Sequence, residues 1–132
     1  MRTLILNGTP FAAKELDAVD ESFYSNFVVR WLYKTYQVPL SEITRDKINH
    51  ALHDLNVVRY RAWLMIRNSG VSLQQMGSLV TDENVVDVYS STFGNLADDQ
   101  PVVPTIQEHV DNLRHLMKKQ SEEDKSETPS ET

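Results

Sequence analysis

The feature that most constrains this chain is a short apolar segment, residues 3–6, that is followed at once by Asn7-Gly8. Asn-Gly between apolar residues is the strongest local signal for a tight β-hairpin turn. Pro10 and Phe11 then resume in a form compatible with an edge strand, where a missing backbone N–H is tolerated. We therefore predict a β-ribbon over residues 3–13. The rest of the sequence gives no further strand signal.

A first helix is predicted directly after this ribbon. Asp17 is a good N-cap, and the acids that follow it suit the positive end of a helix. An apolar stripe then recurs at helical spacing, made by Tyr24, Phe27, Val28 and Trp31. Pro39 disfavours α conformation at the residue before it, so we expect the helix to end there.

The second predicted helix is the longest and most regular. We expect Ser41 to cap it and Gly70 to follow its end. Its apolar stripe runs without interruption and consists of Ile48, Ala51, Leu52, Leu55, Val58, Ala62, Met65 and Ile66.

Three shorter helices are predicted in the remainder. Ser72 and Gln75 match a capping box, and Thr81 opens the next helix, for which Gly94-Asn95 is the expected stop. Residues 98–104 are expected to form a loop. Thr105 and Glu108 match a second capping box, and the last helix has one narrow apolar stripe: Ile106, Val110, Leu113 and Met117.

These elements predict a mainly α fold, with a small N-terminal β-ribbon and a bundle of about four to five helices in a single domain, residues 1–120. From Ser121 onward the chain has no apolar residue except Pro129. Such a segment cannot offset the entropy lost on ordering, so residues 121–132 are expected to be a disordered acidic tail.

Composition narrows the classes of function. Net charge is −6 at pH 7, and residues 121–132 contribute −4 of it, so the body lacks the clustered cations that bind phosphates. The densest basic group is Arg59, Arg61 and Arg67, which we interpret as a solvated helix face beside a buried one. We predict no nucleic-acid binding.

The sequence also argues against secretion and membrane insertion. There is no cysteine, which fits a reducing compartment. No stretch approaches the ~18 apolar residues of a membrane span, and the run at residues 4–6 is far shorter than the core of a signal peptide. We therefore expect a cytoplasmic protein with no membrane partner.

No catalytic constellation is visible. His50 and His53 are spaced to share a metal and are followed by Asp54, but His109 and His115 lie on a distant helix. A structural or surface role is favoured for these histidines. No serine stands in a nucleophile-elbow context, and no glycine-rich phosphate loop is present. We predict no enzyme activity, no cofactor and no metal.

The aromatic residues of the first helix point instead to protein binding. Its aromatic side chains cannot share one face, so the helix is either buried on two sides or contacts a partner chain. Tyr33 and Tyr36 lie away from the main stripe and are the candidate contact residues. Leu4 and Leu6, in the first strand of the ribbon, are two further candidate contact residues. The unpaired edge of a two-stranded ribbon can pair with a client or with a second copy of the chain.

The ribbon with its central Asn-Gly and the phrase Phe11-Ala12-Ala13-Lys14-Glu15-Leu16-Asp17-Ala18 resemble the tail assembly chaperones of long-tailed bacteriophages. The match covers residues 3–20 as a motif and the rest only as architecture. The resemblance implies a small acidic helical protein, acting in the host cytoplasm, that binds tape-measure and tail-tube subunits and prevents premature assembly. It implies no catalytic residues.

Two other functions stay open at this point. One is a small regulatory protein from a phage or mobile element that inhibits a host enzyme. The other is a small helical DNA-binding protein, for which residues 71–86 are the candidate helix-turn-helix. The second helix of that candidate carries Asp82, Glu83 and Asp87 and no cation, which argues against docking in a DNA groove.

Overall fold

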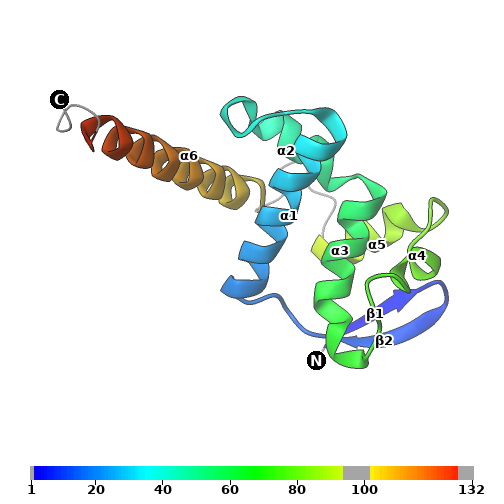
Figure 1. The fold of residues 1–132 in the computed structure, drawn as a ribbon. Helices are drawn as coiled ribbons and strands as arrows, with labels where there is room; N and C mark the ends of the chain where they lie inside the picture. Colours follow the sequence, from blue (N-terminus) through cyan, green and yellow to red (C-terminus); the bar gives the residue numbers. More distant parts are fainter. Residues whose placement is uncertain (1, 94–101, 128–132) are drawn as a thin grey trace.

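The computed structural model describes the backbone of residues 2–93 and 102–127, and side chains as far as residue 119. It confirms a mainly helical fold behind a two-stranded antiparallel ribbon (Figure 1). In chain order the elements are β1 (Arg2–Leu6), β2 (Thr9–Ala13), α1 (Ala18–Tyr36), the 3₁₀ turn η1 (Leu40–Glu42), α2 (Arg45–Leu52), α3 (Leu55–Ile66), the 3₁₀ turn η2 (Arg67–Ser69), α4 (Met76–Leu79), α5 (Val85–Phe93) and α6 (Val102–Glu127).

The ribbon forms as predicted, and its turn is at Asn7-Gly8. Both turn residues have positive φ, 50° and 80°, as a type I′ turn requires. Leu4 pairs with Phe11 and Leu6 pairs with Thr9. Because side chains alternate along a strand, Leu4 and Leu6 share one face, which packs into the core, while Ile5 points to solvent.

Helix α1 begins and ends where the sequence indicates. Asp17 and Asp20 form a reciprocal capping box, in which Asp17 Oδ1 accepts from the Asp20 backbone N–H at 2.8 Å. At the other end Gln37 adopts the left-handed conformation, and its backbone N–H donates to the Tyr33 carbonyl. Pro39 follows two residues later, so the chain turns sharply away from the helix axis.

The predicted second helix is two helices, and this expectation was wrong. The chain leaves helical conformation at Asp54, which has an extended ψ of 139°. Asp54 is held there by α1, because Trp31 Nε1 and the Tyr36 hydroxyl both donate to its Oδ2. Thr44, not Ser41, caps α2, and Ser41 lies in η1.

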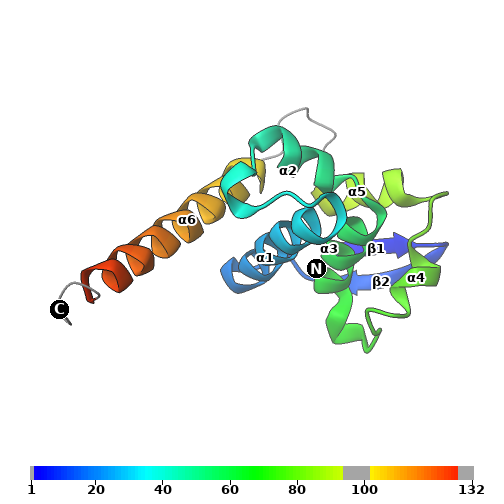
Figure 2. The same cartoon turned by 45° about the horizontal axis from the view of Figure 1, so that its top comes forward.

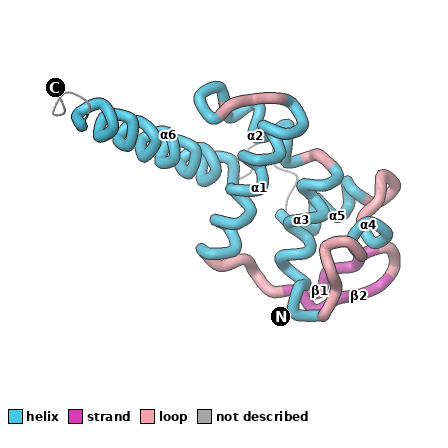
Figure 3. The backbone as a smooth tube through the Cα atoms, viewed as in Figure 1, coloured by secondary structure: helices cyan, strands magenta, loops and turns pink. Residues whose placement is uncertain are grey.

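Helix α3 is the centre of the core. It contacts α1, α2, α5 and β2, and its buried residues include Val57, Leu64 and Ile66 (Figures 2 and 3). The ribbon is joined to α3 by a hydrogen bond of 2.9 Å from the Lys14 backbone N–H to the Met65 carbonyl. One face of the ribbon is covered by helices, since α3 packs on β2 and α5 packs on β1.

Short helices close the other side of α3. Ser72 and Gln75 form the predicted capping box, with reciprocal bonds of 2.8 and 3.1 Å, but α4 itself is only one turn long. Before α5, the side chain of Asn84 accepts from the Thr81 N–H and donates to the Leu79 carbonyl. The predicted stop of α5 at Gly94-Asn95 lies outside the described residues.

Helix α6 begins earlier and extends further than predicted. It starts at Val102, so Pro104 lies in the first turn, where a missing N–H is tolerated, and Thr105 is inside the helix instead of capping it. Val102 and Val103 are buried, which favours helix over the expected loop.

Helical backbone then continues past Ser121, where we expected ordered structure to end, as far as Glu127. Pro129 is the first helix-breaking residue in this part of the sequence. Residues 128–132 of the predicted tail lie outside the described part of the chain. Among the helices that the structure describes, none has both the length and the apolar character needed to cross a membrane.

Candidate functional site

An apolar groove lies where the C-terminal half of α1 meets η1 and the projecting part of α6, and we call it the α1–α6 groove. It consists of two adjoining hollows that share Pro39 and Leu40. One hollow, of about 340 Å³, is lined by Val29, Arg30, Tyr33, Lys34, Val38, Pro39 and Leu40. The other, of about 450 Å³, is lined by Pro39, Leu40, Ser41, Arg114 and Met117.

The turn after α1 builds the floor of this groove. The Val38 backbone N–H donates to the Leu32 carbonyl at 3.1 Å, so the chain folds back beside the helix that it has just left. Pro39 then restricts the backbone, and Leu40 enters η1 facing α6. The apolar floor therefore follows from the left-handed cap and the proline that the sequence places here.

Arg114 fixes α6 against that floor. Its Nε donates to the Leu40 carbonyl and its Nη2 to the Ile43 carbonyl, both at 2.8 Å. His109 makes a second contact one turn earlier, where its Nε2 lies 2.7 Å from Asn26 Oδ1 on α1. Burial lowers the pKa of His109, which favours the neutral imidazole at this contact.

Beyond Arg114, helix α6 extends away from the body of the protein, as two views agree (Figures 1 and 2). Leu116 is 60% exposed and Met117 is 61% exposed on this part of the helix. Across the groove Tyr33 is 64% exposed. Tyr33 in one hollow and Met117 in the adjoining hollow thus expose apolar surface along the groove, which marks a surface suited to binding.

The structure separates the two predicted tyrosines. Tyr33 lines the α1–α6 groove, as a contact residue must. Tyr36 instead packs edge-on against His50 and donates its hydroxyl proton to Asp54 over 2.8 Å. That hydrogen bond, with smaller contributions from desolvation and the nearby carboxylate charge, raises the pKa of Tyr36. Tyr36 therefore supports the structure beside the groove.

The two predicted strand residues do not form an accessible surface. Leu4 and Leu6 are almost completely buried against the helical core. We expected them at an exposed strand edge, but the face of the ribbon that carries both side chains is covered by this chain itself. On the opposite face of β1, Thr3 and Ile5 are exposed.

The arginines predicted to be a solvated face are structural. Arg61 is only 8% exposed, makes a bidentate ion pair with Glu21 and lies over the rings of Tyr24 and Phe93. Burial raises the pKa of Tyr24 far above its usual value, so this hydroxyl stays neutral. The solvated-face interpretation is wrong for Arg61.

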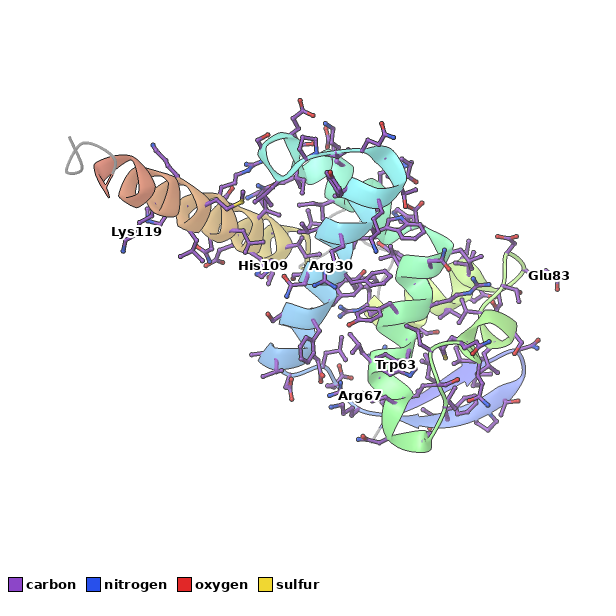
Figure 4. The ribbon with its side chains drawn as sticks, in the orientation of Figure 1. Arg30, Trp63, Arg67, Glu83, His109 and Lys119 are labelled. Atoms are coloured by element: carbon purple, nitrogen blue, oxygen red, sulfur yellow. The ribbon has the colours of Figure 1, made fainter. Side chains whose placement is uncertain are left out.

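Arg67 belongs to a second buried network. It pairs at 2.8 Å with Asp20, whose carboxylate also binds Lys14 at 3.0 Å (Figure 4). Asp20 is fully buried, and the two cations join the ribbon exit, α1 and η2. These charges hold elements together and are not part of the groove.

The histidines show no shared ligand geometry. His50 packs on Tyr36, His53 packs on Tyr89, and His109 contacts Asn26. Among the described residues, no three histidine or carboxylate side chains are grouped closely enough to hold a metal ion.

Sequence reasoning missed the α6 side of the groove. Met117 belonged to a stripe that we expected to be buried, and Leu116 fell outside it. The available signal was the length of the helical pattern, since a helix longer than the body that it packs on must project from it.

Comparison of this chain with protein-family models, with curated protein sequences and with solved structures finds no match.

Proposed function

We propose that this protein is a non-enzymatic chaperone that binds an unfolded or unassembled partner polypeptide in the α1–α6 groove. The observation that carries the proposal is the exposure of Tyr33 in one hollow of the groove and of Met117 in the adjoining hollow, which share Pro39 and Leu40. A chaperone that prevents premature assembly must cover apolar surface of its client, and it needs accessible apolar surface of its own to do so.

The rim of the groove indicates the chemistry of the client segment. Arg30, Lys34 and Arg114 line it, and among the residues with described side chains no carboxylate does so, although Arg114 also lies 3.5 Å from Asp111. A segment with apolar side chains and acidic neighbours would match both the floor and the rim. Aromatic and Met side chains are enriched at interfaces of this kind, because they bury a large area or adapt their shape.

The identity of the client comes from the resemblance of residues 3–20 to phage tail assembly chaperones. On that basis we propose that the clients are tape-measure and tail-tube subunits, and that the chaperone acts in the cytoplasm of the host cell. The net charge of −6 would keep a complex with exposed apolar surface in solution. We propose no nucleic-acid partner.

Co-expression with tape-measure and tail-tube candidates, followed by pull-down, tests this function. Tyr33→Ser/Met117→Ser removes apolar surface from both sides of the groove. Val86→Ser is the matched control, because Val86 is equally exposed but lies on α5. We expect the wild type and the control to capture a client and the groove variant to lose it.

The two ways in which this test can fail are distinct. If the wild type captures no candidate and binds a host enzyme or DNA tightly, the chaperone proposal is wrong. If capture survives in the groove variant, the function stands and the α1–α6 groove is not the site. Circular dichroism of each variant establishes that it is folded.

A further inference from the structure

A second hollow, of about 480 Å³, lies on the other flank of α1, and we call it the α1–α3 hollow. Arg30 and Lys34 separate it from the α1–α6 groove, since both residues line both sites. Its lining comes from α1, α3, α4 and the loop before α4: Phe27, Arg30, Trp31, Lys34, Asn56, Arg59, Leu73, Gln74 and Gly77.

One wall of the hollow is aromatic and rigid. The Phe27 ring stacks on Tyr60, with centroids 4.2 Å apart and planes within 5°, and it lies nearly parallel to Trp31 at 6.3 Å. Trp31 is further fixed by the 2.6 Å hydrogen bond from its Nε1 to Asp54. Leu73, which is 42% exposed, faces this wall from the loop before α4. A bulky apolar side chain would find contacts on both sides.

The remaining lining is cationic. Arg59 is held in place, because its Nε donates to the Val80 carbonyl at 2.8 Å and its Nη2 to the Gly77 carbonyl at 3.2 Å. Arg30, which is labelled in Figure 4, and Lys34 are both exposed. Within the described residues neither makes an ion pair or a side-chain hydrogen bond. Among the described residues, no carboxylate lines the hollow. Three cationic side chains therefore line one hollow of a protein that is acidic as a whole, and the donors of Arg59 are bonded to neutral oxygens, including Asn56 Oδ1.

We propose that the α1–α3 hollow binds an acidic polypeptide segment that carries a bulky apolar side chain. The apolar side chain enters between the aromatic wall and Leu73, and flanking carboxylates pair with Arg30, Lys34 and Arg59. Pairing at a partly desolvated rim strengthens charge-assisted hydrogen bonds, while the apolar contact supplies the burial that a small anion would lack.

Charge and ring geometry favour this occupant over single-stranded nucleic acid. Sites for single strands combine separate aromatic platforms with a cationic track that follows the backbone. Here the rings stack on one another, which leaves no slot between them for a base, and the three cations gather at one hollow. A short acidic peptide does not require such a cationic track.

Selection from a random dodecapeptide phage-display library tests this inference, and nucleic acid is tested with an oligothymidylate. We expect the wild type to enrich peptides in which Asp or Glu adjoins Trp, Phe or Leu. In ¹⁵N-labelled protein, a selected peptide should shift the indole signal of Trp31, which lines the hollow, more than that of Trp63, which does not line it and reaches it only through Tyr60 and Phe27.

Two variants and two controls locate the site. Arg30→Gln/Lys34→Gln should weaken the selected peptide about tenfold or more, and Leu73→Ser should also weaken it. Lys118→Gln/Lys119→Gln, which removes the same charge from α6, and Val86→Ser should bind like the wild type. Leu73 lines only the α1–α3 hollow, whereas Tyr33 and Met117 line only the α1–α6 groove. Peptide binding that is lost in Leu73→Ser but kept in Tyr33→Ser/Met117→Ser therefore reports on the hollow, independently of the chaperone function.

The inference is overturned by any of four results. These are no enrichment, enriched peptides without acids, unchanged affinity in the Arg30→Gln/Lys34→Gln and Leu73→Ser variants, or displacement of the peptide by oligothymidylate at equal concentration. Acidic apolar peptides that shift Trp31 and require Arg30, Lys34 and Leu73 establish it.

Discussion

The hydroxyl of Tyr36 donates a 2.8 Å hydrogen bond to Oδ2 of Asp54, so the last residue of α1 is tied to the residue that separates α2 from α3. Trp31 Nε1 donates to the same oxygen at 2.6 Å. One carboxylate thus sets the break between two helices, holds the end of α1 and fixes a wall of the α1–α3 hollow. Of the two candidate surfaces on the flanks of α1, the α1–α3 hollow contains a residue that Asp54 holds directly, Trp31.

Asp54→Ala is predicted to destabilise the protein by ~1–3 kcal/mol, because it leaves the half-buried indole N–H of Trp31 without its acceptor. Asp54→Asn keeps an acceptor oxygen and should lose less. Urea unfolding followed by circular dichroism measures both free energies. Equal stability of the wild type and Asp54→Ala would show that the two donors find other partners.

The buried pair of Arg61 and Glu21 gives a second prediction. Glu21→Ala leaves a nearly buried guanidinium without its carboxylate, and we expect a loss of roughly 3 kcal/mol, reduced by the aromatic contacts that remain. The matched change is Glu15→Ala, which breaks the exposed pair with Arg2 and should alter the free energy of unfolding by about 0–1 kcal/mol. Similar losses of unfolding free energy in the two variants would mean that burial does not determine how much the pair of Arg61 and Glu21 contributes to stability.

Core substitutions in α2 and α3 should follow burial. Leu52→Ala and Ile66→Ala each remove a fully buried side chain and should cost ~2–5 kcal/mol of unfolding free energy. Leu55 is only half-buried at the start of α3, so Leu55→Ala should cost less than either. Thermal and urea unfolding of the three variants give the order, and near-neutral values for Leu52 and Ile66 would contradict the described core.

The contact between His109 and Asn26 predicts a pH dependence. Because burial lowers the pKa of His109 in the folded state, the folded protein binds this proton less readily than the unfolded chain. Stability from this group is therefore present above its unfolded pKa, near 6.5, and declines as the pH falls through that value. Urea midpoints at about pH 7.5 and about pH 5.5 should differ more in the wild type than in His109→Gln. An equal difference in both proteins would exclude this residue as the cause.

Signals that act between near neighbours in the sequence predicted their elements well. Asn7-Gly8 gave the turn, Asp17 gave the start of α1, and Ser72 with Gln75 gave a capping box, because each of these depends on residues within a few positions. The mainly helical fold class followed from another local signal, the recurrence of apolar residues at helical spacing.

Features decided by distant residues were not predictable in this way. The apolar stripe of α2 and α3 is continuous, and the break at Asp54 is made by donors 18 and 23 residues earlier. Leu4 and Leu6 are buried because the ribbon lies on the helical core, which no local pattern reveals. Tyr33 was found as an exposed aromatic residue off the main stripe, whereas Met117 belonged to a stripe whose far end is exposed in the described part of the chain.

Site-specific photocrosslinking tests the central claim, a polypeptide in the α1–α6 groove, most directly. Benzoylphenylalanine replaces Tyr33, whose exposure leaves room for the larger side chain, and the same residue at the equally exposed Val86 is the control. During co-expression with tape-measure and tail-tube candidates, we predict an adduct from position 33 that mass spectrometry assigns to one of these clients, and none from position 86. No polypeptide adduct at position 33, or equal adducts at both positions, would contradict the account.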